Sequence, residues 1–439
     1  MPKPLPAAGA GSRSKSTDAA PDPRSAAYDV LNIAKDHRTI LCLDGGGMRG
    51  ILTIQLLKKL EEVAGIPCYQ LFDMVAGTST GAIIAGLITT GHTALQIETL
   101  YENLVTKVFD HRTLGNRFIN PPAFTKEKYR DLLKEVVKDL TLEEACRMND
   151  LDLMITSKDM SAAEETFFSC FKQPDGSFFG TYKQVLLRSV MEATMSAPTY
   201  FYPLERFVDG GTTTYNNPSL AAFMEAVSYS IAPKEDLASS QNIQPALNPN
   251  PKSPSSAEPG TVSPDYQLSK ITIFSFGTGI SRQFIKPTGT VNPHGIDLTF
   301  WLNWLMTEMG QDASAMQVDT FRSPMIKKLV DFRRFQISLD PTAIGKLPNI
   351  GTLDEKKYHT KWLHDIGEDI LGSIDMADTT KFDLMKVIGT QMAEYIMQVN
   401  EFKQDLLVAN RDALVTATGD VVRIRKQLSD PEWLGAFKA

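Results

Sequence analysis

The sequence predicts a three-layer α/β/α fold with a mostly parallel central sheet. Two successive units support this prediction, the first over 39–61 and the second over 72–88. In each unit a short apolar strand runs into a glycine-rich turn, and apolar residues at helical spacing follow the turn. Two strand–turn–helix units in a row indicate parallel strands whose connecting helices cover the sheet.

The length, charge and cysteine content of the chain limit the classes of protein to which it can belong. The 439 residues can bury one large core or two, and a net charge of −7 argues against a binder of nucleic-acid polymers. The four cysteines lie far apart without C-x-x-C spacing, which predicts buried thiols in a reducing compartment. Because the sequence shows neither a signal-peptide pattern nor an apolar run of membrane-spanning length, we expect a cytoplasmic protein.

Three segments are expected along the chain. Residues 1–37 are rich in Pro, Ala, Gly and Ser, which predicts a disordered tail. Residues 38–373 form the main domain, interrupted by a Pro/Ser-rich insertion at 238–267. Residues 374–439 are expected to be a helical extension, whose amphipathic helix either packs on the domain or forms a homo-oligomer.

The first turn has the sequence Asp44-Gly-Gly-Gly-Met-Arg-Gly50 and opens a helix. Adjacent glycines let the backbone come close to a ligand with its N–H groups pointing outward. The N-terminus of the helix adds partial positive charge, so the turn predicts a site for negative charge. We favour an oxyanion hole formed by the N–H groups of Gly46 and Gly47, with Gly45 and Met48 as further candidates.

Two other interpretations of this turn remain open. Its glycines at 45, 47 and 50 also fit the dinucleotide fingerprint G-x-G-x-x-G, so a nucleotide-cofactor-binding α/β protein is the alternative function. That alternative needs an acidic residue at the end of the next strand, and Asp73 precedes the apolar strand residues instead. Within the turn, Arg49 either adds positive charge toward a phosphate-bearing substrate or braces the loop.

The second turn, Gly77-Thr-Ser-Thr-Gly81, fits the nucleophile-elbow pattern G-x-S-x-G. Its glycines permit a sharp turn that exposes the Ser79 Oγ above the end of a strand. The helix that follows places backbone amides near this hydroxyl and favours negative charge there. An ordinary tight turn with a solvated serine is the competing interpretation, because so short a pattern also arises by chance.

A serine nucleophile needs a base. The usual order of serine, acid and histidine leaves His294, His359 and His364, none of which follows a strand or a glycine. By contrast, Asp209 stands at a strand end before two glycines, where its carboxylate can approach another turn and take the Ser79 proton directly. Capping of its own turn is the competing role for this aspartate.

Together the glycine turn at 44–50, the serine turn at 77–81 and the Asp-Gly-Gly turn at 209–211, in this order, resemble the patatin-like phospholipase family. Further fragments agree: Ala193-Thr-Met-Ser-Ala-Pro-Thr-Tyr-Phe201, Asn216-Asn-Pro218 and Phe276-Gly-Thr-Gly279. The resemblance covers about 38–373, with the insertion at 238–267 as a departure that leaves the three turns untouched.

This resemblance implies a serine–aspartate lipid acyl hydrolase that requires no cofactor and no metal. It implies Ser79 as nucleophile, Asp209 as base, and the Gly45–Gly47 amides as oxyanion hole beside Arg49. The substrates would be glycerophospholipids at a membrane surface, cleaved through an acyl-enzyme. Some bacterial members act in antiviral defence under a cyclic-nucleotide activator, which makes such control a hypothesis here. The aromatic and methionine stripe at 300–309 would line an acyl groove or form plain core.

Overall fold

The central sheet is built from nine strands in the part of the chain that the structure describes. The computed structural model describes residues 22–109, 126–173, 175–198, 200–231, 267–280, 298–339, 341–350, 377 and 379–408. The strands in chain order are β1 (Arg38–Leu43), β2 (Met74–Thr78), β3 (Asp152–Asp159), β4 (Glu164–Lys172), β5 (Phe178–Phe179), β6 (Phe207–Asp209), β7 (Ile271–Phe276), β8 (Asp331–Ile337) and β9 (Leu406–Val408).

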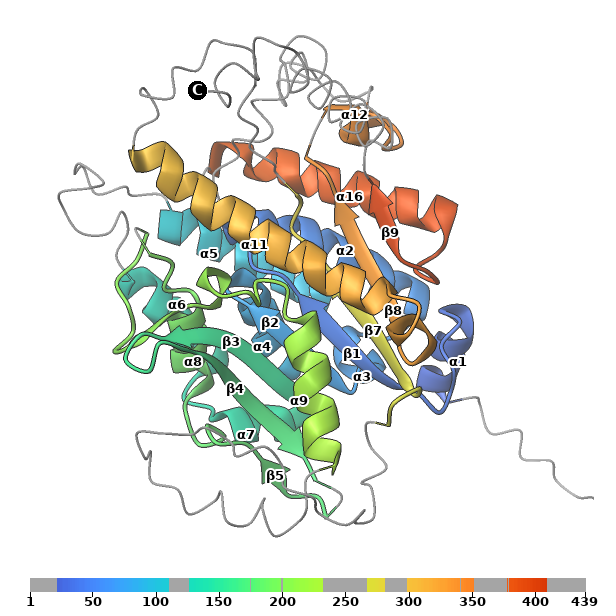
Figure 1. Ribbon diagram of the computed structural model, residues 1–439, viewed down its shortest axis with the longest axis horizontal. Coiled ribbons are helices and arrows are strands. Elements are labelled where there is room, and N and C mark those ends of the chain that lie inside the picture. Colours follow the sequence, from blue (N-terminus) through green and yellow to red (C-terminus); the bar gives the residue numbers. More distant parts are fainter. Residues whose placement is uncertain are drawn as a thin grey trace, which may run out of the picture.

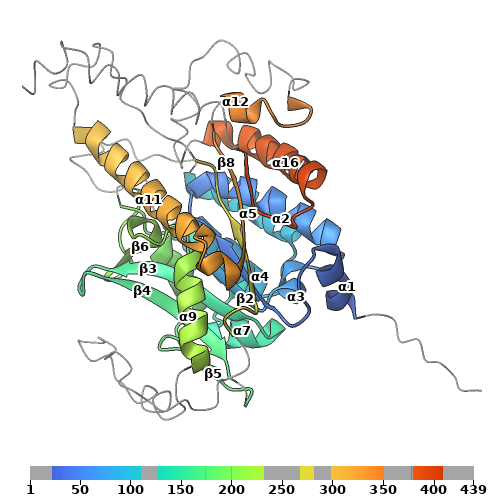
Figure 2. The same cartoon turned by 45° about the vertical axis from the view of Figure 1, so that its right-hand side comes forward.

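Helices cover both faces of this sheet (Figures 1 and 2). The helices are α1 (Pro23–Val30), α2 (Gly50–Ala64), α3 (Cys68–Leu71), α4 (Thr80–Thr89), α5 (Ala94–Phe109), α6 (Glu127–Val137), α7 (Leu142–Asn149), α8 (Leu187–Thr194), α9 (Ser219–Ile231), α11 (Leu298–Arg322), α12 (Pro341–Ile344) and α16 (Phe382–Val399). Short 3₁₀ turns are η1 (Gly47–Arg49), η2 (Gly210–Thr212), η4 (Ile326–Lys328) and η6 (Thr379–Lys381).

Six strands, in the order β3-β2-β1-β7-β8-β9, run parallel to their neighbours. β4, β5 and β6 join antiparallel, and β6 pairs with β3. This arrangement confirms the predicted mostly parallel sheet. Because parallel strands end at the same edge, the turns after β1, β2 and β7 come together there.

The three layers follow from alternation along the strands. In β1, Leu41 and Leu43 belong to the larger apolar core, which packs against α2, α4, α8 and α16. Ile40 and Cys42 face the opposite way, into a smaller core with α9 and the end of α11. A strand covered on both faces is apolar at nearly every position, as the sequence of β1 is.

The N-terminal segment is more ordered than predicted. Residues 22–37 were expected to belong to a disordered tail, yet 23–30 form α1, which Asp22 caps. Tyr28 is buried, and its hydroxyl hydrogen-bonds the Thr39 hydroxyl at 3.2 Å. The prediction failed there because a favourable cap and one aromatic anchor outweigh a composition rich in small residues. Residues 1–21 lie outside the described residues.

The C-terminal extension is a part of the same domain. α16 packs along α2, as one of the two predicted arrangements proposed. β9 then adds a parallel strand beside β8, so the extension is not purely helical. The remainder, 409–439, lies outside the described residues, as does the part of the predicted insertion at 238–266.

All four cysteines are buried free thiols, as the sequence predicts. Burial raises the pKa of the Cys42 thiol to about 12. A thiol that stays protonated at neutral pH is a poor nucleophile and metal ligand, so Cys42 serves as a small apolar core residue.

The contact between α16 and α2 generates a stability prediction. A Cβ on Gly389 would lie 2.8 Å from the Leu52 Cα and 2.9 Å from the Leu52 carbonyl oxygen. Because backbone atoms cannot rotate away, we expect Gly389→Val to lower the free energy of unfolding by about 1–3 kcal/mol, measured by urea denaturation.

Gly310→Ala in α11 is the matched control, because a Cβ there meets no atom of the described residues within 4 Å. Its stability should stay unchanged or rise by up to ~1 kcal/mol, as expected for alanine in a helix. Equal losses in both variants would show that the helix contact at Gly389 is unimportant.

Candidate active site

The Ser79 turn joins β2 to α4 at the carboxyl edge of the sheet. Ser79 has φ +53° and ψ −121°, a conformation that side chains rarely adopt. A Cβ on Gly77 would lie 2.4 Å from the Gly81 carbonyl oxygen, and one on Gly81 would lie 2.2 Å from the Leu43 carbonyl oxygen. The two glycines therefore make a turn this tight possible, in agreement with the predicted nucleophile elbow.

The hydroxyl at this turn meets the predicted base. Ser79 Oγ donates a 2.7 Å hydrogen bond to Asp209 Oδ2, and the two residues are only 7% and 4% exposed. The second oxygen, Oδ1, accepts the Gly211 N–H at 2.6 Å. Asp209 thus caps its own turn and contacts the serine at the same time, so the capping contact leaves the predicted role as base open.

Burial changes the acidity of this carboxyl. It raises the pKa of Asp209 to about 6, while the hydrogen bonds from Ser79 and Gly211 work in the opposite direction. A carboxylate with a pKa near neutrality is a stronger base than an exposed aspartate, yet it remains ionised at pH 7. A carboxyl with this pKa would be well matched to proton transfer from a hydroxyl.

The glycine turn faces this pair. A Cβ on Gly45 would lie 3.2 Å from the Ser79 Cβ, which places the two turns in contact. The carbonyls of the turn are held by hydrogen bonds: Gly45 O by Thr278 Oγ1 at 2.8 Å, Gly46 O by Arg49 Nε at 3.3 Å, and Gly47 O by the Tyr101 hydroxyl. Such anchoring of the carbonyls fixes the orientation of the intervening N–H groups.

The backbone N–H groups of the glycine turn differ in whether a hydrogen-bond acceptor already engages them. Among the described residues, the N–H groups of Gly46, Gly47 and Met48 have no hydrogen-bond acceptor. The Gly45 N–H donates to the Asn216 carbonyl at 3.2 Å. The expectation that Gly45 supplies an oxyanion donor therefore needs correction, because its amide is already engaged, and the candidate donors are Gly46, Gly47 and Met48.

Arg49 is half-buried and lies against the turn. Its Nε donates to the Gly46 carbonyl, which supports the bracing role. The residue also lines the cavity described next, so the alternative contact with a substrate phosphate stays a prediction.

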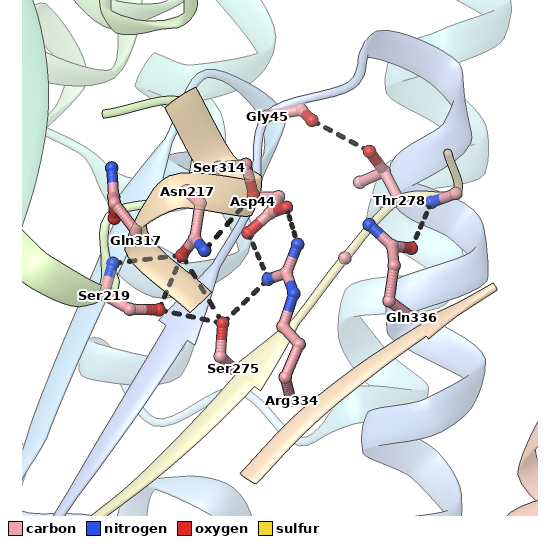
Figure 3. A network of polar contacts seen from close by, with 12 residues as sticks. Asp44, Gly45, Asn217, Ser219, Ser275, Thr278, Ser314, Gln317, Arg334 and Gln336 are labelled. Atoms are coloured by element: carbon pink, nitrogen blue, oxygen red, sulfur yellow. Dashed lines mark hydrogen bonds and ion pairs between the residues drawn. The ribbon is translucent and has the colours of Figure 1, made fainter. Parts of the chain in front are cut away.

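A cavity of about 440 Å³ opens above the two turns. Its lining includes Gly46, Ser79 and Asp209 on one side, and α11 residues such as Ser314 and Val318 on the other. Figure 3 shows Ser314 of α11 close to Asn217 and Asp44 at the base of this region. The cavity gives a substrate carbonyl access to the serine. Of the predicted stripe at 300–309, the structure confirms the helix, while its side chains lie outside the described ones.

Sequence reasoning assigned no role to Thr194, Thr278 or Arg334. Thr194 Oγ1 accepts the Ser79 N–H at 2.8 Å, which holds the strained turn in place. The sequence signals for Thr194 and Thr278 were the fragments at 193–201 and 276–279, which carried no chemistry of their own. Arg334 had no signal, because a lone arginine in a strand does not reveal its partner.

The nucleotide-binding interpretation needs an acidic residue near the glycine turn, and Asp73 does not lie there. Asp73 lies just before β2, at the amino edge of the sheet, away from the glycine turn. Its carboxylate pairs with Arg24 at 2.7 Å and Arg38 at 2.5 Å. A ribose bound at the glycine turn would be out of its reach. The histidine candidates 294, 359 and 364 lie outside the described residues.

Two features are absent from the part of the chain that the structure describes. There, no group of three or more His, Cys, Asp or Glu side chains is placed to hold a metal ion. Likewise, none of the described helices combines the length and the apolar character needed to cross a bilayer.

Known proteins resemble the segment that carries these turns. Residues 41–223 match the family model described as patatin-like phospholipase. The cUMP-AMP-activated phospholipase of Escherichia coli is 31% identical over 227 residues, which cover 48% of this chain and 66% of that protein. The cGAMP-activated phospholipase of Escherichia coli (strain TW11681) is 28% identical over 291 residues, covering 61% and 76%.

The match to a mammalian relative covers a smaller part of that protein. The 85/88 kDa calcium-independent phospholipase A2 of Mus musculus is 30% identical over 207 residues, covering 44% of this chain and 24% of that protein. The chain therefore spans between about a quarter and three quarters of the length of these relatives. Since the matched segment includes the glycine turn, Ser79 and Asp209, the chain belongs to the patatin-like phospholipase family.

Proposed function

We propose that the chain is a lipid acyl hydrolase that cleaves fatty acyl esters of glycerophospholipids. The observation that carries this proposal is the 2.7 Å contact between Ser79 Oγ and Asp209 Oδ2, beside a glycine turn in which three N–H groups find no acceptor among the described residues. The family match and the phospholipase names of the relatives support the choice of substrate. Acyl transfer to serine needs a nucleophile, a base and donors for the oxyanion, and these residues offer a candidate for each.

In the first half of the reaction, Asp209 takes the proton of the Ser79 hydroxyl as its Oγ attacks the ester carbonyl. The carbonyl oxygen becomes an oxyanion and accepts hydrogen bonds from the N–H groups of Gly46, Gly47 and Met48. When the tetrahedral intermediate collapses, the bond to the glycerol oxygen breaks. Protonated Asp209 donates its proton to that oxygen, which leaves as the alcohol of a lysophospholipid.

In the second half, water attacks the acyl-enzyme. Asp209 takes one proton from the water as the new C–O bond forms, and the same N–H groups hold the oxyanion. Collapse breaks the bond to Ser79 Oγ, which recovers the proton from Asp209, and a fatty acid is released. One carboxyl therefore acts as base and acid in turn, so its pKa near 6 suits both directions of transfer.

Regulation by a cyclic nucleotide is also part of the proposal. Two relatives are named as cUMP-AMP-activated and cGAMP-activated phospholipases. Membrane-surface action, a cytoplasmic location, a role in antiviral defence and a homo-oligomeric state stay predictions from the resemblance.

Substitution of Ser79 or of Asp209 tests their proposed roles as nucleophile and base. With mixed phospholipid vesicles, we expect Ser79→Ala to lower fatty-acid release by at least ~10³-fold. Asp209→Asn should lower it by about 10²–10⁴-fold, the usual contribution of a general base. Ser177→Ala and Asp139→Asn, exposed residues in other parts of the chain, are the matched controls and should keep full activity. Activity retained in Asp209→Asn would transfer the base to another residue.

The pKa of Asp209 sets the pH dependence. Because the carboxylate must be ionised to take the serine proton, kcat/KM should fall as the pH drops below about 6, with a midpoint near that value. The same raised pKa makes ionisation unfavourable to folding, so the wild type loses stability as the pH rises from about 4, the pKa in unfolded chains, through 6. Asp209→Asn removes this penalty.

Thermal denaturation measures the second effect. The Asp209→Asn variant should have a higher Tm than the wild type at pH 8 and about the same Tm at pH 4. A rate profile with its acid limb near pH 4, together with no gain in Tm at pH 8, would show that the carboxyl is not perturbed in solution.

The activator hypothesis has its own measurement. Cyclic dinucleotides and trinucleotides, titrated separately into wild type with vesicles, should raise fatty-acid release at least ~10-fold for one of them, which corresponds to about 1.4 kcal/mol in activation free energy. Equal release with and without every nucleotide would refute cyclic-nucleotide control and leave the hydrolase assignment intact.

A further inference from the structure

A buried ion pair lies directly beneath the glycine turn (Figure 3). Asp44 is the residue that precedes the three glycines, and Arg334 lies on β8. Arg334 Nη1 donates to Asp44 Oδ1 at 2.7 Å, and Nη2 donates to Asp44 Oδ2. The two side chains are only 5% and 4% exposed, although they are 290 residues apart in the chain.

We propose that Arg334 is a positioning residue that holds the oxyanion turn in its active geometry through Asp44. This inference rests on the proposed acyl-transfer function. Arg334 lies outside residues 41–223, the segment that matches the family model.

The backbone of the glycine turn needs support from its neighbours. Three consecutive glycines have no side chains to pack, so neighbouring groups must fix their backbone. Asp44 is the last residue before them that carries a side chain, and its carboxylate is clamped by the fork of Arg334. The next carbonyl, that of Gly45, is held by Thr278, and the Gly279 N–H donates to Gln336 Oε1 at 2.9 Å. The ends of β7 and β8 therefore hold the start of the turn.

The guanidinium group of Arg334 donates to more than one side chain beneath the turn. Besides the two bonds to Asp44, Arg334 Nη1 donates to Ser275 Oγ at 2.7 Å. That hydroxyl also accepts a hydrogen bond from Ser219 Oγ at 2.8 Å. Figure 3 shows the guanidinium group of Arg334 on β8 in contact with Asp44, which follows β1, and with Ser275 of β7. A planar fork satisfies these acceptors together, whereas the ammonium of lysine cannot reproduce the two parallel bonds.

Arg334 also balances the negative charge of Asp44 near the candidate oxyanion donors. Asp44 lies two residues before Gly46, the first candidate oxyanion donor, and it lines the same cavity. An unpaired carboxylate at that position would repel the oxyanion that forms in the transition state. Arg334 cancels this charge in a region that water does not screen. A buried ion pair adds little net stability, so geometry and charge balance are the better reasons for its presence.

The test compares Arg334→Lys and Asp44→Asn with Arg333→Lys. Arg333 is the neighbouring residue on β8 and is also buried, but it faces away from the turn. It donates to the carbonyls of Leu31 and Phe402 and pairs with Asp331. Its variant therefore controls for the loss of a buried arginine from the same strand.

Four quantities are measured on the full chain: kcat and KM on phospholipid vesicles, the rate of Ser79 labelling by an alkyl fluorophosphonate, and Tm. The fluorophosphonate reaction also forms an oxyanion but needs no lipid. We expect Arg334→Lys and Asp44→Asn to lower kcat and the labelling rate by about 10²-fold at similar KM, since small misplacement of catalytic groups has effects of this size. Arg333→Lys should lower Tm and leave both rates per folded molecule unchanged.

Each other outcome contradicts a stated part of the proposal. If Arg334→Lys and Asp44→Asn fold and label as fast as wild type, or if Arg333→Lys loses rate equally, the positioning role is wrong and the hydrolase function stands. If wild type labels at Ser79 but cleaves no phospholipid with any activator, the substrate assignment fails, and the labelling rates still decide the role of Arg334. Wild type that fails to label overturns both proposals.

Discussion

The shared strand β3 is the constraint on which the site depends. β2 pairs with one edge of β3, where Thr78 lies opposite Thr156. β6 pairs with β3 as well, where Asp209 lies opposite Ser157. Ser79 directly follows Thr78, and Asp209 lies opposite the β3 residue next to Thr156, so the proposed nucleophile and base meet at neighbouring positions along a single strand. A one-residue shift of the β6 pairing would turn Asp209 to the other face, and the same shift of the β2 pairing would displace Ser79, so either shift would remove their contact.

The sequence revealed the parts of the site whose chemistry is local. The glycine turn and the Ser79 turn are recognisable because tight backbone geometry demands glycine at fixed spacing, and the parallel sheet follows from the same units. Asp209 was found through its own glycines. Arg334 was not predictable, because its partner Asp44 is 290 residues away. Likewise α1 was missed because its anchor, Tyr28, gains its meaning only from Thr39 on the neighbouring strand.

The site places several unfavourable features close together. Ser79 has a strained backbone, Asp209 is a buried carboxyl with a raised pKa, and the Asp44–Arg334 pair carries two buried charges. Each of these opposes folding when taken alone. The large apolar core on the α2 and α4 face stabilises the fold sufficiently to hold them. Strain of this kind is typical of groups that are arranged for a transition state before the substrate binds.

The two halves of the sheet contribute different parts of the machinery. The Ser79–Asp209 contact belongs to β2, β3 and β6, whereas the oxyanion turn is held from β7 and β8 through Thr278 and Arg334. α11, which lines the cavity, ends at Arg322, only nine residues before β8 begins at Asp331. A displacement of α11 or β8 would therefore reach the N–H groups of the turn without disturbing Ser79 or Asp209. Control exerted from this side of the molecule would act on stabilisation of the transition state, and so on kcat, while Ser79 and Asp209 stayed in contact.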